Sequence, residues 1–235
     1  MVPFRSHLVA QYLRRLAALA TITLTLPATS ADNPASPEGL NRWLAQQADI
    51  QTWSAEVTQT RTLQSLAQPL TTQGRVWFKA PNLFRWELGQ PARTIAIREP
   101  EQLVLLYPRL KRAEIYPLTG DKTGPWRSSL TLLEAGFPRQ QDDLTTQFNV
   151  LKVETSGESS IVHLEPKAAE ARRWVTSIQV TLRTTNLNLE ATQLTFADGS
   201  TLRNEFHNAQ PNSEINPDLL KASIPSDFET SLPTQ

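Results

Sequence analysis

The chain contains few residues of the types that carry out acid–base, nucleophilic or metal chemistry. Its 235 residues include three histidines, His7, His163 and His207, and no cysteine. His163 lies inside a stretch that alternates like a β-strand, and His207 lies at the end of another. Histidines in such positions are more often structural residues than general bases or metal ligands. The lack of cysteine excludes disulfides, thiolate metal sites, a cysteine nucleophile and a cysteine-linked lipid anchor from this sequence.

Carboxylates and catalytic motifs give no stronger signal. Asp142 and Asp143 are adjacent, but acidic residues near the start of a helix are usually solvated and favoured by the helix dipole. There is no glycine-rich phosphate loop, Gly-x-Ser-x-Gly elbow or His-Glu-x-x-His motif. We therefore expect no enzymatic activity, no metal and no cofactor. The weakest alternative, an envelope esterase or lipid-modifying enzyme, requires His163 or His207 to lie beside a serine and a carboxylate in an apolar cavity.

The sequence provides instead a hairpin rich in aromatic side chains. Residues 74–88 alternate like two strands joined at Pro81, which presets the φ angle of a turn and donates no hydrogen bond. One apolar face is formed by Val76 and Phe78 on the first strand and by Phe84, Trp86 and Leu88 on the second. A sheet in water keeps one apolar face only when something covers it. We expect part of that cover to be a lipid.

The first 31 residues predict a secretory signal peptide. A basic region with Arg5, Arg14 and Arg15 precedes an apolar run over residues 16–26, and small residues follow near Ser30. This run is shorter than the roughly 20 residues that cross a bilayer, which disfavours the alternative of a membrane anchor. Without this segment the chain has 20 basic and 23 acidic side chains, a net charge of −3. Such a balance gives no electrostatic argument for nucleic acid or an anionic membrane as partner.

Residues 32–235 are expected to form a single α+β domain. A helix begins at Pro37 and carries an apolar stripe of Leu40, Trp43, Leu44 and Ala48. From Gln51 the period changes to two, and about ten or eleven strands with frequent turns predict one antiparallel sheet that must curl. Leu103–Tyr107 is apolar on both faces, which predicts a strand covered on both sides. The tail after Phe228 is expected to be loose.

The strand pattern breaks between residues 120 and 148. A helix is expected where Trp126, Leu130, Leu133 and Phe137 recur at helical spacing, and a weaker helix over 142–148. Helices inserted between strands and flanked by glycine and proline suit a lid over the apolar face of the sheet. They equally suit ordinary core packing, and the sequence leaves both interpretations open.

Several segments carry a resemblance to a known family. In chain order they are Trp53–Gln59, Gly74–Lys79, Pro81–Phe84 with Trp86, Gln90-Pro91, Ile95, Ile97, Tyr107-Pro108 and Leu164–Lys167. Together they resemble the periplasmic outer-membrane lipoprotein carrier family (LolA-like). The resemblance implies an unclosed antiparallel β-barrel with helices as a lid over an apolar cavity. It also implies a carrier that receives acylated lipoproteins from an inner-membrane ABC transporter and passes them to an outer-membrane receptor.

We expect the cargo to bind in the apolar cavity. The expected cargo-binding side chains are Phe78, Phe84, Trp86, Ile95, Ile97, Leu130 and Leu133, of which the resemblance places Phe84 in the cavity wall. Well-studied family members have an arginine before the turn proline that holds the lid closed, whereas this chain has Ala80. We therefore consider Arg85 as the lid contact.

Two functions are compatible with these expectations. The first is a soluble, monomeric periplasmic carrier that binds acylated lipoproteins or another lipidic cargo and acts in outer-membrane biogenesis. The alternative is a lipid-sensing regulatory module of the same fold that controls an envelope partner. The sequence identifies neither the cargo nor the donor and acceptor.

Overall fold

The computed structural model describes residues 37–119 and 141–232. The expected signal peptide and the helix expected around residues 126–137, including Leu130 and Leu133, lie outside the described residues.

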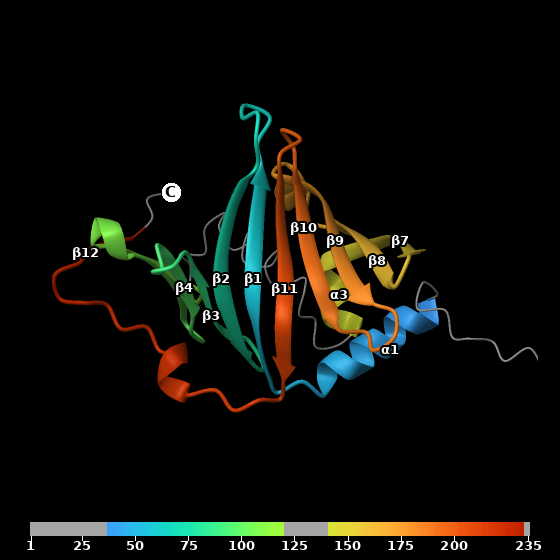
Figure 1. Ribbon diagram of the computed structural model, residues 1–235, viewed down its shortest axis with the longest axis horizontal. Helices are drawn as coiled ribbons and strands as arrows, with labels where there is room; N and C mark the ends of the chain where they lie inside the picture. Colours follow the sequence, from blue (N-terminus) through green and yellow to red (C-terminus); the bar gives the residue numbers. More distant parts are fainter. Residues whose placement is uncertain (1–36, 120–140, 233–235) are drawn as a thin grey trace, which may run out of the picture. The chain divides into compact units, whose positions relative to one another are not determined.

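Twelve strands form one sheet (Figure 1). The strands are β1 (Thr52–Thr62), β2 (Leu70–Lys79), β3 (Leu83–Leu88), β4 (Thr94–Arg98), β5 (Gln102–Tyr107), β6 (Arg112–Pro117), β7 (Phe148–Ser156), β8 (Ser159–Pro166), β9 (Val175–Arg183), β10 (Leu189–Phe196), β11 (Thr201–Pro211) and β12 (Glu229–Ser231). Their order in the sheet is β12-β6-β5-β4-β3-β2-β1-β11-β10-β9-β8-β7, and all neighbours pair antiparallel except β12 and β6. Because the order runs from β12 to β7 without joining them, the sheet is curled but unclosed, which confirms the predicted unclosed, curled sheet, although it has twelve strands rather than the ten or eleven expected.

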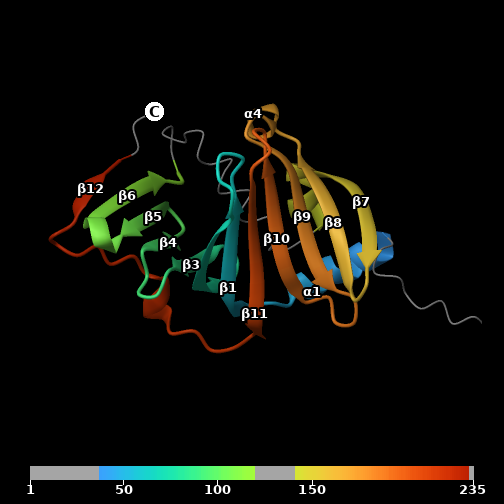
Figure 2. The ribbon, with the colours of Figure 1, turned by 45° about the horizontal axis from the view of Figure 1, so that its top comes forward.

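The described ranges also contain short helices, drawn around the sheet in Figure 2. The α-helices are α1 (Pro37–Ala48), α3 (Gln141–Gln147) and α4 (Ala169–Arg172), and the 3-10 helices are η1 (Pro108–Leu110) and η2 (Pro217–Leu220). α3 confirms the weak helix expected near residue 142. α1 confirms the first helix. Its buried face ends at Gln47 instead of the predicted Ala48, which is exposed.

We call the face that packs against α1 and α3 the inner face. Trp43 of α1 and Leu144 of α3 are fully buried in the same cluster as strand residues such as Val57, Val76 and Ile178. In a strand, alternate side chains point to the same face, so the members of this cluster show which side chains of each strand face inward. The predicted inward orientation of Val76 and Phe78 is confirmed.

The opposite, outer face carries a second apolar cluster over β4, β5 and β6. Its buried members are Ile97, Val104, Leu106 and Ala113, and Ala222, Ile224 and Phe228 of the C-terminal segment pack against them. β5 thus contributes Leu103 to the inner cluster and Val104 to the outer one, which confirms the prediction of a strand covered on both sides.

The C-terminal segment is ordered beyond Phe228, so the prediction of a loose tail is wrong for Glu229–Ser231. These residues form β12 and pair with β6. The pairing is supported by the Glu229 N–H, which donates to the carbonyl of Lys111 at 2.8 Å, and by an ion pair of 3.0 Å between Lys111 and Asp227.

Candidate functional site

The aromatic side chains of β1, β2, β3 and β11 lie together on the inner face. Phe78 and Phe84 are directly paired across β2 and β3, and Trp86 follows two residues further along β3. The ring of Phe206 meets the ring of Trp53 edge-on, with 5.3 Å between centroids, and that of Trp86 at 5.9 Å. Edge-to-face contacts of this kind add to the stability gained from buried area. The result is a continuous aromatic surface that spans four strands, which we call the aromatic surface.

The aromatic surface is less completely covered than the inner face over β9. On β9, Ile178 and Val180 are both 0% exposed. Phe78, Phe84 and Trp86 keep 7%, 8% and 9% of their surface exposed. The inner face over β9 is therefore closed core, whereas these three aromatic side chains keep a small exposed fraction.

Trp86 also carries a polar group without a partner. Its indole N–H is buried and has no hydrogen-bond acceptor. Leaving a buried donor without an acceptor costs about 1–3 kcal/mol. The aromatic surface therefore contains a hydrogen-bond donor that no described residue satisfies.

A polar cluster lies on the inner face of β5 and β6, beside the aromatic surface. Glu114 accepts hydrogen bonds from the hydroxyls of Tyr116 at 2.9 Å and Tyr107 at 3.2 Å, and it pairs with Arg112 at 2.8 Å. Burial, followed by the hydrogen bond to Glu114, raises the pKa of Tyr116 to about 12. Burial also raises the pKa of Tyr107. Both hydroxyls therefore stay protonated and act as donors at neutral pH.

Ile95 and Ile97 do not lie with the aromatic surface, contrary to the expectation from the sequence. Ile97 pairs with Arg85 and Ile95 with Glu87, whereas Phe84 is on the alternate face of β3. Directly paired residues of neighbouring strands share a face. Ile97 is accordingly buried in the outer cluster and Ile95 packs against it, because the C-terminal segment covers this part of the sheet.

Arg85 likewise faces outward, so it does not reach the inner face as the expected lid contact would. Its Nε donates to Glu87 at 2.6 Å, and its Nη1 donates to the carbonyl of Leu219 at 3.4 Å. Leu219 belongs to η2, which packs on β3. Arg85 thus helps to hold the C-terminal segment on the outer face.

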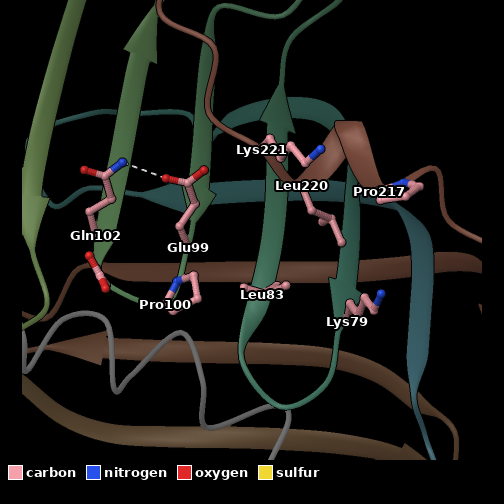
Figure 3. A pocket seen from close by; sticks show the side chains of 9 residues that line it. Lys79, Leu83, Glu99, Pro100, Gln102, Pro217, Leu220 and Lys221 are labelled. Atoms are coloured by element: carbon pink, nitrogen blue, oxygen red, sulfur yellow. Dashed lines mark hydrogen bonds between the residues drawn. The ribbon is translucent and has the colours of Figure 1, made fainter.

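The C-terminal segment also forms a pocket of about 510 Å³ that the sequence did not indicate (Figure 3). Its lining residues are Lys79, Leu83, Glu99, Pro100, Glu101, Gln102, Pro217, Leu220 and Lys221. Glu99 accepts hydrogen bonds from Gln102 at 2.6 Å and from the N–H of Ala222 at 2.9 Å. Ala222 lies 123 residues beyond Glu99, and no periodicity in the sequence connects such distant segments.

The two histidines of the described part of the chain have different partners. His163 contacts Glu154 at 2.7 Å, and His207 contacts Thr58 at 3.3 Å. Across residues 37–119 and 141–232, no group of three or more histidine, aspartate or glutamate side chains is arranged to hold a metal ion. The helices in the same ranges are too short or too polar to cross a membrane.

Comparison with known proteins gives one family and several distant relatives. The family model described as "Outer membrane lipoprotein carrier protein LolA" matches residues 48–223. An outer-membrane lipoprotein carrier protein of Chromohalobacter salexigens is 26% identical over 204 residues, covering 86% of this chain and 90% of the relative.

Solved structures with a similar fold are much more distant in sequence. A conserved protein from Thermus thermophilus is 9% identical with a TM-score of 0.49, covering 84% of this chain and all of its own. A LolA superfamily protein from Nitrosomonas europaea is 8% identical with a TM-score of 0.41, covering 77% of this chain and 97% of its own. Because the family model spans well over half of its length, the chain belongs to the outer membrane lipoprotein carrier protein (LolA) family.

Proposed function

We propose that this protein is a periplasmic carrier that binds the acyl chains of lipoproteins on the aromatic surface of its inner face. It receives them from an ABC transporter of the inner membrane and passes them to a receptor on the outer membrane, acting as a monomer and without catalysis. The observation that carries the proposal is the continuous aromatic surface of the inner face, where Phe78, Phe84 and Trp86 keep a small exposed fraction that the core over β9 does not. Leu130 and Leu133 remain predicted members of the same site.

The energy of acyl burial suits a carrier and also limits how it works. Each buried methylene is worth about 0.8 kcal/mol, so one chain of about 15 methylenes contributes roughly 12 kcal/mol when fully buried. Several fully buried chains would exceed the ceiling of about 18–21 kcal/mol for non-covalent affinity. A protein that must release its cargo therefore buries it incompletely or uses part of this energy to open.

The free N–H of Trp86 gives this site a way to recognise more than hydrocarbon. The acyl chains of a diacylglyceryl group are joined through ester carbonyls, which are hydrogen-bond acceptors. A carbonyl beside Trp86 would satisfy a donor that is buried without a partner in the described structure. Cargo with ester groups would then bind more tightly than cargo of equal length without them.

Native mass spectrometry of the exported protein, followed by extraction of the co-purifying material, tests the proposal. We expect bound acylated lipoprotein or diacyl lipid with the native chain. Phe84→Glu places a charge on the aromatic surface and abolishes this binding. Leu83→Glu places the same charge on the adjacent residue, which pairs with Lys79 on the outer face, and leaves binding intact.

Phe84→Leu is the second variant, because a glutamate at this buried position can prevent folding. Leucine keeps an apolar side chain but removes the ring, so the variant should fold and bind acyl cargo more weakly than the native protein. Normal binding by a folded Phe84→Glu variant, or equal loss in Leu83→Glu, contradicts the assignment of the site.

A further inference from the structure

Three of the large apolar side chains that the protein exposes lie at one end of the sheet. Trp174 is 69% exposed, Leu70 is 50% exposed and Leu66 is 44% exposed. They belong to the segment before β9, the start of β2 and the β1–β2 loop. Isolated exposed leucines are ordinary, but a tryptophan with this exposure and two exposed leucines at the same end of the sheet form an unusual surface.

Contacts between three turns hold these side chains at the same end. The carbonyl of Trp174 accepts a hydrogen bond from the N–H of Ala197 in the β10–β11 turn, at 2.9 Å. In the same turn, Gly199 lies so close to Gln64 of the β1–β2 loop that a methyl group on it would come within 2.4 Å of the Gln64 Nε2. The two loops project side by side in Figure 1, and α4 lies next to them in Figure 2. We call residues 61–70, 167–174 and 197–200 the tip.

The tip is basic although the chain without its first 31 residues is acidic. It contains Arg61, Lys167, Arg172 and Arg173 against Glu170 and Asp198. Asp198 is engaged within its own turn, where it accepts hydrogen bonds from the N–H of Ser200 at 2.9 Å and its hydroxyl at 2.6 Å. Arg61 and Arg173 are exposed and form no ion pair with any residue in the described ranges.

We propose that the tip docks on the surface of a phospholipid membrane that contains anionic lipids. Tryptophan prefers the boundary between headgroups and acyl chains, where its ring is buried and its N–H stays hydrated. Arg61 and Arg173 complement anionic headgroups, and such contacts act over short range near the surface. Because the rest of the chain is net acidic, an anionic membrane attracts the tip and repels other faces, so the charge pattern also orients the protein.

Co-sedimentation with protein-free vesicles tests this docking. The protein without residues 1–31 is mixed with vesicles of phosphatidylcholine alone or with added phosphatidylglycerol, and the bound fraction is measured. We expect binding to the anionic vesicles. Trp174→Ser should weaken it at least about tenfold, and Arg173→Gln roughly fivefold and only where phosphatidylglycerol is present.

The matched control is Leu110→Ser, which removes an exposed leucine from η1 and should leave binding unchanged. Leu110 is 67% exposed, about as much as Trp174, but lies outside the tip. Far-ultraviolet circular dichroism confirms that all variants fold. The proposal is overturned if the native protein binds neither kind of vesicle, or if Leu110→Ser weakens binding as much as Trp174→Ser. The vesicles carry no protein. If the native protein does not bind them, the tip is instead a contact surface for a protein partner.

Discussion

Replacing Trp86 by phenylalanine tests whether the aromatic surface is built for an external ligand. The variant keeps an aromatic ring against Phe206 and removes the indole N–H that is buried without an acceptor. Trp53→Phe is the matched control, because Trp53 packs against the same ring and its N–H is not among the buried donors that lack an acceptor. Both substitutions remove an indole N–H, and they differ mainly in whether that N–H is a buried donor without an acceptor.

The expected magnitudes follow from two opposing terms. Shrinking a buried indole to a phenyl ring costs about 1–2 kcal/mol in lost burial and residual cavity. Removing an unsatisfied buried donor raises the free energy of unfolding by about 1–3 kcal/mol. For Trp86→Phe these terms nearly cancel, so the free energy of unfolding should change by less than about 1 kcal/mol. For Trp53→Phe only the cost remains, so stability should fall by about 1–2 kcal/mol.

Urea unfolding of the protein without residues 1–31, followed by far-ultraviolet circular dichroism, measures both changes. A binding assay with diacyl and dialkyl-ether lipids of equal chain length then completes the test. We expect Trp86→Phe to weaken diacyl binding about two- to tenfold, the value of one hydrogen bond, and to leave ether-lipid binding almost unchanged. The reasoning is refuted if Trp86→Phe lowers stability as much as Trp53→Phe and affects both lipids equally.

Three further predictions concern the sheet that supports this surface. Gly74→Ala should destabilise the protein by more than about 2 kcal/mol, because the added methyl group would lie 1.9 Å from the carbonyl oxygen of Glu87. Urea unfolding measures this change. An unchanged urea midpoint would contradict the close approach of β2 and β3. The native protein should lose stability as the pH rises from 10 to about 12, because the folded state holds the pKa of Tyr116 above its ordinary value of 10.0 and so keeps a proton that the unfolded state releases. Tyr116→Phe should make this loss of stability smaller. An identical pH profile for the variant and the native protein would exclude the effect. Phe228→Ala should lower stability and speed hydrogen exchange in β12, since Phe228 packs on the outer cluster; the same exchange rates as in the native protein would show that this contact does not hold the C-terminal segment.

The sequence predicted the central hairpin well because its signals are local. Alternation between apolar and polar residues and a proline turn were enough to place Phe78, Phe84 and Trp86 on one face of β2 and β3, as the strand register confirms. The same alternation in β4 identified Ile95 and Ile97 as a pair on one face. It did not say which face, and the pairing of Ile97 with Arg85 places both residues outward.

The sequence did not predict that a segment far along the chain covers the outer face of the sheet. Ile97 is buried because Ala222, Ile224 and Phe228 return across β4 to β6 from the far end of the chain. β12 has three residues and no usable periodicity, so only its parallel pairing with β6 reveals it as a strand. The orphan N–H of Trp86 also needs coordinates, since a sequence does not show whether a buried donor has an acceptor.

The short strand β12 has a consequence for how this protein behaves among copies of itself. An open sheet offers two free edges, and either could recruit a strand of a neighbouring molecule and begin a polymer. At one edge β12 occupies only three positions of β6. At the other, β7 is interrupted by an irregularity between Val150 and Lys152 and carries charged Lys152 and Glu154. A short strand on one side and a bent, charged strand on the other therefore protect an unclosed sheet against aggregation.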